Sequence, residues 1–217
     1  DDTAAMQAVL TAGAGKRVNG RPGASYIISA PLVIASGTTL DLTGCTVTLK
    51  AGSSCRMVQN AALSGAGARD TDITIRGGYW DRGANGGELN GLHSIVIHRA
   101  DRVRVSDIRY TATGACKYSI YLCDVTDALV ERCNITSTSD GVHVTGPASR
   151  VTVRDISGAT DDDLVSFTGR DYPNYELTSG GGDVTDVSVE RLRLLGSGTA
   201  NIIKLVAGAA KTPSGVV

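Results

Sequence analysis

Hydrophobic and polar residues alternate along five short segments of this chain, and the five segments resemble one another. They read SIVIHRADRVRV, SIYLCDVTDALV, GVHVTGPASRVTV, LVSFTGRDYP…VTDVSV and IIKLVAG. Each contains an alternating apolar stretch and a polar turn, and the first three continue directly into a second alternating stretch. Alternation with a period of two indicates β-strands, because successive side chains of a strand point to opposite faces.

The five segments recur at a spacing that indicates a solenoid. Their equivalent positions are separated by 25, 22, 23 and 38 residues along the chain. Repeats of twenty-odd residues are typical of solenoids, whose coils bury their apolar faces only by stacking on one another. We therefore expect two internal ladders, one of Ile95, Ile120, Val142, Val165 and Ile203 and one of Val105, Val130, Val153 and Val189.

The pattern predicts an all-β fold, namely a right-handed, single-stranded parallel β-helix with a short capping α-helix at its N-terminus. An antiparallel sandwich also uses short strands and regular turns, but the similarity here runs from coil to coil with one polarity. A leucine-rich repeat would show a regular framework of Leu and Asn, which this sequence lacks. The extra residues of the fourth segment, around residues 169–182, would form a loop thrown out from the coil.

All 217 residues are expected to form one β-helix domain with a cap, coils and an end without pattern. Residues 1–15 form the cap, in which residues 3–12 predict a helix with Asp2 or Thr3 as its N-cap. Residues 26–206 form the coils, and residues 207–217 would fray or lead into missing sequence. The apolar residues that would cover the open end of the solenoid are Met6, Val9 and Leu10.

Within the coils, the first strands are expected over residues 26–34 and 39–49. Loops are expected over residues 61–69 and 83–91, where small, polar and glycine residues predominate.

Composition adds restrictions on chemistry and partners. Aromatic residues make up only 4% of the chain, so aliphatic side chains must fill the core. The five cysteines are odd in number and lack CxxC spacing, which favours free buried thiols over disulfides. The net charge of −1 gives no electrostatic attraction to nucleic acid or an anionic membrane. No apolar run approaches 18 residues, so we expect no membrane insertion.

Two parts of the chain resemble known families. The opening DDTAAMQAVLTAGAG…YIISAPLVIASGTTLDLTG resembles the start of pectate-lyase-like β-helix domains in bacteriophage tail spikes. Residues 118–206 resemble the polygalacturonase family of glycoside hydrolases, which carries NTDG and DDC motifs in successive coils, then Gly-His-Gly and Arg-Ile-Lys motifs. TSDGVHV (138–144) matches the first motif, DDLVSF (162–167) the second, and IIK (202–204) only the end of the last. No histidine follows Asp163, and Ile202 stands in place of the arginine.

These resemblances imply a polysaccharide-degrading enzyme without cofactor or metal. The implied protein is a phage tail-associated depolymerase that hydrolyses a bacterial surface polysaccharide, located outside the cell or on the virion, with a homotrimer as its assembly. They also imply that Asp162 is the general acid and that Asp140 with Asp163 activates the water. Lys204 would bind an acidic or hydroxyl-rich sugar in the neighbouring subsite.

The spacing of the aspartates supports a carboxylate site independently. Asp140 begins one coil and Asp163 the next, and stacked parallel strands lie about 4.8 Å apart, so these two and Asp162 should crowd together. Like charges so close raise one pKa and leave an acid beside a base, as inverting glycoside cleavage requires. Asp140–Gly141 is also an ordinary turn signal, although a turn needs only one aspartate, and Asp161 is an alternative member of the pair.

Side chains beside this cluster are candidates for binding substrate. If Val142 and Val144 face the core, His143 faces outward to orient a substrate hydroxyl or assist an aspartate. A lone surface histidine is, however, more often merely solvated. The same outward stripe and the adjacent loop RDYPNYE supply Tyr121, Ser166, Lys204, Arg170 and Tyr175.

Two other functions remain open. A non-catalytic β-helix would serve as a receptor-binding surface or as a rigid stalk of a tail. A polysaccharide lyase would need a lysine or arginine base and often calcium, which the acidic cluster could hold. The sequence does not name the polysaccharide in any of these cases.

Overall fold

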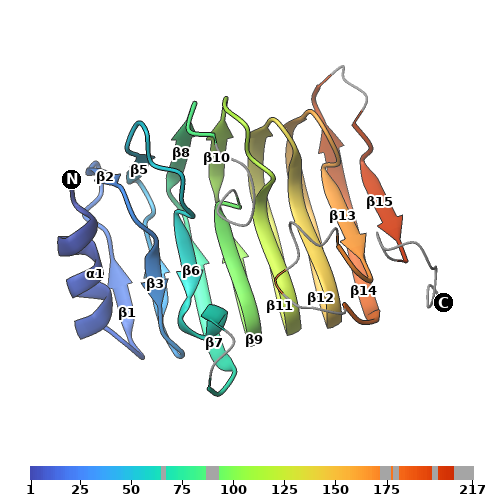
Figure 1. Ribbon diagram of the computed structural model, residues 1–217, viewed down its shortest axis with the longest axis horizontal. Coiled ribbons are helices and arrows are strands. Elements are labelled where there is room, and N and C mark those ends of the chain that lie inside the picture. Colours follow the sequence, from blue (N-terminus) through green and yellow to red (C-terminus); the bar gives the residue numbers. More distant parts are fainter. Residues whose placement is uncertain (65–66, 87–92, 172–176, 178–180, 197–199, 208–217) are drawn as a thin grey trace.

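The computed structural model describes residues 1–64, 67–86, 93–171, 177, 181–196 and 200–207. Their coils stack from helix α1 (Thr3–Ala12) at one end to strand β15 (Ile203–Val206) at the other, as Figure 1 shows. Every strand pairing in the described part of the chain is parallel. The fold class predicted from the sequence, a parallel β-helix, is confirmed.

The coils present three faces, each a parallel sheet. The first sheet contains β3 (Leu32–Ile34), β6 (Val58–Asn60), β13 (Val165–Thr168) and β15. The second contains β1 (Arg17–Asn19), β4 (Thr39–Asp41), β7 (Asp70–Arg76) and β14 (Val184–Leu194). The third contains β2 (Ser25–Ile28), β5 (Thr46–Leu49), β8 (Tyr79–Gly83) and β10 (Arg109–Ala112).

Three long strands bend from face to face and join the sheets. They are β9 (Ile95–Ser106), β11 (Tyr118–Ser137) and β12 (Asp140–Thr160). β9 runs through the first and second sheets, since it pairs with both β6 and β7. β11 pairs with β12 from the first sheet through the third, so these two strands form most of two complete coils.

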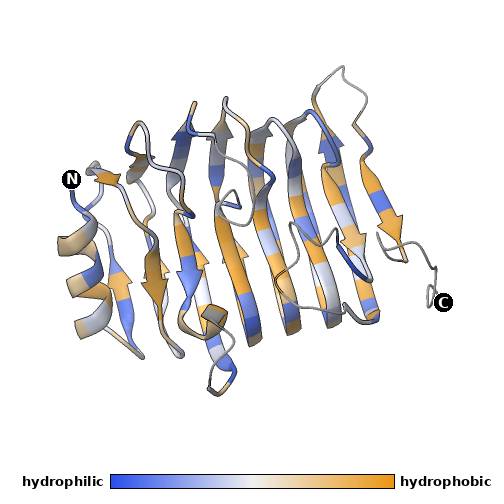
Figure 2. Cartoon of the chain, viewed as in Figure 1, coloured by the Kyte–Doolittle hydropathy of each residue, from blue (hydrophilic) through white to orange (hydrophobic). Residues whose placement is uncertain are grey.

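Both predicted ladders are present in register, and both extend into earlier coils. The first continues from Ile95 to Val58 and Leu32, and the second continues from Val105 to Ile75 and Leu40. Figure 2 shows hydrophobic residues recurring along successive strands in this way. Ile203 is 43% exposed, because no further described strand stacks on β15.

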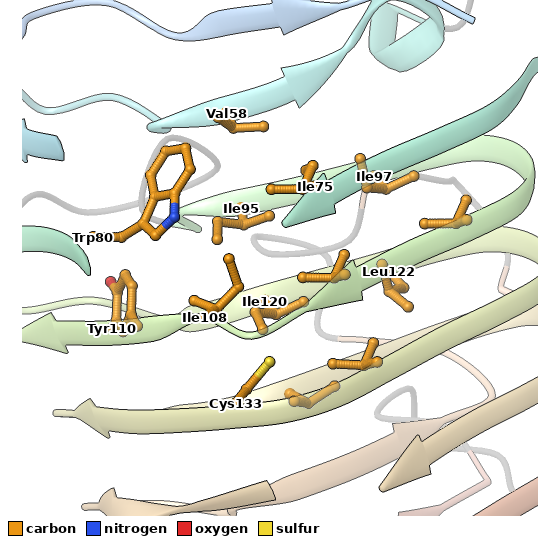
Figure 3. Close-up of a cluster of buried hydrophobic side chains, with 14 of the residues drawn as sticks. Val58, Ile75, Trp80, Ile95, Ile97, Ile108, Tyr110, Ile120, Leu122 and Cys133 are labelled. Carbon is orange, nitrogen blue, oxygen red and sulfur yellow. The ribbon is translucent and has the colours of Figure 1, made fainter. Parts of the chain in front are cut away.

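A third ladder fills the core under the third sheet with larger side chains. Trp80 pairs in register with Tyr110, which pairs with Ile135. Figure 3 shows both aromatic rings beside Ile108 and Cys133, next to the aliphatic ladders. The five cysteines are free, as predicted, and all except the half-buried Cys55 are buried. Trp80 and Tyr110 thus fill the core under the third sheet, whereas Phe167 lies in the core under the first sheet.

The cap helix confirms the predicted range, with two differences in detail. Leu10 is buried and Met6 packs against the core, but Val9 is 56% exposed and covers nothing. Asp2 is the N-cap by position, yet its side chain accepts a hydrogen bond from the backbone N–H of Ile27 instead of capping the helix. Gln7 exchanges two hydrogen bonds with the backbone of Val33, which fixes α1 on the first coil.

The boundaries of the early strands differ from the prediction. Residues 26–34 contain two strands, β2 and β3, and residues 39–49 contain β4 and β5. Each predicted strand spans a corner at which the chain passes to another sheet, so one apolar pattern covers two faces. Residues 61–69 include a short 3₁₀ helix, η1 (Ala61–Ser64), and part of the predicted loop at 83–91 lies outside the described residues.

No helix in the described part of the chain is long and apolar enough to cross a membrane.

Two columns of charged residues mark the corners on either side of the second sheet. All have φ between 52° and 59°, a left-handed conformation that residues other than glycine adopt at a cost. Aspartate and arginine alternate along each column, and bidentate pairs join successive coils, as between Asp72 and Arg102 or between Asp107 and Arg132. A slip by one coil would place like charges together, so the columns favour the observed register.

We predict that Ile120→Ala destabilises the protein by about 2–5 kcal/mol, because the fully buried side chain would leave a cavity in the first ladder. Ile203→Ala removes the same atoms from the same ladder at its exposed end and should cost less than about 1 kcal/mol. Denaturant unfolding of both variants measures the difference. Equal losses would contradict the assignment of this ladder to a continuous core.

Candidate active site

The predicted outward stripe exists on the first sheet, but it is not exposed. Tyr121, His143, Ser166 and Lys204 are register partners on four successive coils. Tyr121, His143 and Ser166 are nonetheless 0%, 3% and 1% exposed, so the prediction of a solvent-facing stripe is wrong for them. Only the Lys204 side chain, 43% exposed, reaches solvent.

Chain segments outside the strands cover this face. Leu63 in η1 and Leu177 pack against a small cluster that contains Tyr121, Tyr118, Cys123 and Val96. The predicted loop after β13 does not simply project from the coil, because Asp171 is 1% exposed and accepts a hydrogen bond of 2.9 Å from the hydroxyl of Tyr118. Burial and the nearby carboxylate of Asp171 raise the pKa of Tyr118, which keeps that hydroxyl protonated.

Three aspartates come together at the open end of this face. One oxygen from each of Asp140, Asp162 and Asp163 lies within 4.8 Å of the others. The backbone explains the approach, since the N–H of Gly141 donates a hydrogen bond of 2.9 Å to the carbonyl oxygen of Asp163. A Cβ at Gly141 would lie 2.5 Å from the carbonyl oxygen of Leu164. Gly141 therefore permits two coils to approach closely within a strand, and the ordinary-turn interpretation of Asp140–Gly141 is wrong.

Asp163 is buried and held by two donors from the next coil. Its Oδ1 accepts a hydrogen bond of 2.7 Å from the side-chain amide of Asn201. Its Oδ2 lies 2.9 Å from Nζ of Lys204. The bond to Asp163 raises the pKa of Lys204 and outweighs the opposing effect of partial burial. Asp163 is thus fixed in position between Asn201 and the cation of Lys204.

Asp140 is held from the other side by His143. Its Oδ2 lies 2.7 Å from Nδ1 of His143, whose Nε2 lies 3.1 Å from the hydroxyl of Thr168. Both ring nitrogens of His143 therefore have a hydrogen-bond partner in the cluster. The imidazole also stacks on the ring of Tyr118 with 3.8 Å between ring centroids. His143 consequently orients Asp140 from behind and is not available to a substrate.

Asp162 differs from the other two aspartates because its side chain is exposed. Partial burial and the charges of Asp140 and Asp163 raise its pKa, against the opposing effects of Lys204 and Lys117. A carboxyl group that keeps its proton to higher pH, beside two fixed carboxyl groups, has the properties of a general acid.

A cavity of about 100 Å³ adjoins these groups. The oxygens of the three aspartates lie within 4.8 Å of one another, so one water can bond to two of them. Asp140 and Asp162 line the cavity, whereas Asp163 is fully buried and does not line it. The residues that line it are Lys117, Tyr118, Ser139, Asp140, His143, Asp162, Ser166, Thr168, Asp171, Lys204 and Val206.

The same three aspartates have enough oxygens to contact a divalent cation. Asp163, however, already bonds to Asn201 and to the ammonium group of Lys204. A cation bound there would have to displace or repel Lys204. The arrangement fits a metal-free carboxylate site better than a calcium site.

The remaining predicted site residues are not brought into the cluster. Asp161 is exposed and does not belong to the aspartate cluster, so Asp162 and Asp163 are the partners of Asp140 in this coil register. Arg170 is half-buried and lies outside the cavity lining. Tyr175 lies outside the described residues.

The residues that sequence reasoning missed are Tyr118, Thr168, Asp171 and Asn201. Tyr118 is the register partner of Asp140, so continuing the ladder alignment along the outward face would have found it. Asp171 comes from an irregular segment, for which the strand pattern carries no information.

No protein-family model matches the chain, and no curated protein sequence matches it. Solved structures that resemble the chain include those of two proteins. The polygalacturonase from Erwinia carotovora ssp. carotovora superposes with a TM-score of 0.68 and 17% identity, covering 94% of this chain and 64% of its own. The surface protein and adhesin PfbA of Streptococcus pneumoniae gives a TM-score of 0.63 and 13% identity, covering 88% of this chain and 57% of its own.

These similarities establish the fold. A second structure of PfbA, at a TM-score of 0.57 and 11% identity, covers 99% of this chain and agrees. The chain thus has the β-helix architecture that an enzyme and an adhesin both use. The chain covers 64% of the polygalacturonase and, in the first superposition, 57% of the adhesin. Both shares are less than two thirds of the other protein.

We predict that Asp163→Asn lowers the pKa of Asp162 toward its ordinary value, because the substitution removes one of the charges that raise it. Asp161→Asn, a matched change outside the cavity lining, should leave the Asp162 pKa in place. Titration of the Asp162 carboxyl carbon by NMR measures both variants. A shift in the Asp161 variant alone would show that the cluster has been assigned to the wrong residues.

Proposed function

We propose that this protein is a polysaccharide-degrading β-helix enzyme that hydrolyses glycosidic bonds with aspartate acid and base groups. The observation that carries the proposal is the meeting of Asp140, Asp162 and Asp163 beside a cavity, with the pKa of the exposed Asp162 raised. A glycosidase needs one carboxyl group that donates a proton and another that activates water or attacks the sugar.

The roles follow from the exposure and partners of each group. Asp162 gives its proton to the glycosidic oxygen, which leaves with the electrons of the broken bond. A water between Asp140 and Asp163 attacks the anomeric carbon and loses its proton to the carboxylate pair. Asp163 is paired with Lys204, and His143 holds Asp140 in place, so neither carboxyl group needs to reorient during the reaction.

Lys204 has a second role in the proposal. Its side chain is 43% exposed at the edge of the cavity. An ammonium group there can bind a carboxylate or hydroxyl group of the neighbouring sugar unit. The arginine of the polygalacturonase motif is replaced by Ile202, so we infer that the preferred sugar differs from the substrate of that family.

We further infer that the substrate is a bacterial surface polysaccharide and that the protein acts outside the cell, on a phage tail. The resemblance of the first 44 residues to tail-spike domains supports the tail, and the similarities to a polygalacturonase and to a surface adhesin are compatible with an extracellular polysaccharide.

Tail spikes of this type assemble as parallel trimers, and we predict the same for this chain. Light scattering of the purified chain should give three times the mass of 22.4 kDa. A stable monomer at micromolar concentration would contradict the trimer without affecting the enzymatic proposal.

A non-catalytic carbohydrate-binding β-helix is the second candidate. Two observations favour it: Asp140 and Asp163 are buried and already hydrogen-bonded, and the fold also matches that of an adhesin. In that case Asp162 and Lys204 would contact a bound saccharide without cleaving it.

We predict that Asp162→Asn lowers the cleavage rate by about 10²–10⁴-fold, because the amide cannot donate the acidic proton. Asp161→Asn is the matched control and should keep wild-type activity, since Asp161 lies outside the cavity lining. The measurement is the release of new reducing ends from a panel of capsular and cell-wall polysaccharides across a range of pH.

Retention of wild-type turnover by the Asp162 variant would overturn the assignment of the general acid. If the wild-type protein cleaves no member of the panel but binds one of them, the binding candidate replaces the enzyme.

A further inference from the structure

A second hollow lies on another face of the solenoid, across the second sheet. Its volume is about 370 Å³. It is formed by β1, β4, β7 and β9, and by residues at the start of the next corner, whereas the candidate active site lies on the first sheet. We call it the arginine groove after the charged residues that line it, Arg17, Arg76, Arg104 and Arg132.

Coil stacking places the groove residues in two outward rows. In the first row Arg17 and Arg104 stand at the two ends, with Thr39 and Thr74 between them. These ends are three coil spacings apart, which corresponds to about 14 Å. In the second row Arg76 pairs in register with Asp41 on one side and with Ser106 on the other. The groove thus presents cationic and hydroxyl groups over a length that fits an extended polymer chain and is greater than the size of a single small anion.

Two of the three carboxylates of this region lie beneath the arginines. The side chains of Asp41 and Glu131 are 7% and 0% exposed and that of Asp107 is 33% exposed, whereas those of the four groove arginines are 45–57% exposed. Solvent therefore meets more guanidinium surface than carboxylate surface. The groove presents a positive surface although the whole chain has a net charge of −1.

One buried carboxylate holds three arginines. Glu131 forms ion pairs with Arg104, Arg132 and Arg154. Burial opposes ionisation of Glu131, but the hydrogen bonds from Arg154 and Arg132 outweigh it and lower its pKa. Glu131 thus fixes three guanidinium groups, of which Arg132 also pairs with Asp107. Three carboxylates, Asp41, Asp107 and Glu131, face the four groove arginines and Arg154, so the arginines lie preorganised and incompletely neutralised.

Arg76 has the most unused binding capacity. Its two ion pairs, to Asp41 and Asp107, are 3.8 and 3.5 Å long. Both distances exceed those of a normal charge-assisted hydrogen bond. The guanidinium has five N–H donors, so a ligand carboxylate or sulfate can bind to it at closer range than either aspartate.

We propose that the arginine groove binds an anionic saccharide chain, through carboxylate or sulfate groups on the arginines and sugar hydroxyls on Thr39, Thr74 and Ser106. Single-stranded nucleic acids, the other common extended polyanions, are bound largely by stacking on aromatic side chains. None of the residues that line the groove is aromatic. The groove is a binding site separate from the candidate active site, and its existence does not depend on catalysis.

Binding can be measured by fluorescence anisotropy with the full chain at low salt. The probes are labelled oligosaccharides of alginate, which carries carboxylates, of sulfated dextran, and of neutral dextran. We expect binding to one or both anionic probes and none to neutral dextran. Binding to a single anionic probe identifies the group that the arginines recognise.

The test variants are Arg76→Gln and Arg17→Gln, each expected to weaken binding about tenfold, as the loss of one charge-assisted contact implies. Arg193→Gln is the matched control, since Arg193 is exposed on the third-sheet part of β14, outside the groove. Asp162→Asn should bind the probes as the wild type does. Thermal unfolding verifies that each variant is folded.

Four results would overturn the proposal. The first is that the wild type binds neither anionic probe, and the second is that both groove variants bind the probes as tightly as the wild type. The third is that the Arg193 variant loses as much affinity as the groove variants. The fourth is that the Asp162 variant loses as much affinity as they do. The last result would place the probe at the active site. Tighter binding of a single-stranded DNA oligonucleotide than of either anionic saccharide would replace the saccharide by a nucleic acid.

Discussion

The parallel stacking of one coil on the next is the constraint on which every other feature of this protein depends. Hydrogen bonds between strands fix the register, and the register then assigns each residue to a column that runs the length of the solenoid. Inward columns become the apolar ladders of the core. Outward columns bring residues more than twenty positions apart in the sequence into contact, which is how Asp140 meets Asp163 and how Arg17 aligns with Arg104.

The ladders and the aspartate cluster could be predicted from the sequence because both follow directly from that register. Repeat spacing alone was sufficient to place Ile120 on Val142 and Asp140 near Asp163. Burial of the outward face could not be predicted. The segments that cover Tyr121 and His143 lie between the strands, where no periodicity shows what they pack against.

Two further features escaped the sequence pattern for related reasons. The groove arginines lie in different coils and share no motif, so only the completed stack shows that they are neighbours. Residues such as Asp127 and Arg150 adopt left-handed conformations, which cannot be predicted from composition. The alternation of their charges becomes apparent only when successive coils are aligned. Long-range register therefore carries more of the functional information here than local propensity does.

The three aspartates of the cluster differ in their hydrogen-bond partners and in their exposure to solvent. Asp163 bonds to Lys204 and Asn201, Asp140 to His143, and only Asp162 meets solvent with a raised pKa. A polygalacturonase and an adhesin share this fold, so the fold alone does not decide between cleavage and binding. The proposal of cleavage rests on the meeting of the three carboxyl groups beside one cavity and on the raised pKa of Asp162.

The central claim is that water attacks a glycosidic bond at this cluster, and product analysis in water enriched in the heavy isotope of oxygen tests it most directly. The account predicts that mass spectrometry finds one heavy oxygen at the new reducing end of each product. Unsaturated products without the heavy oxygen would contradict it and indicate a lyase.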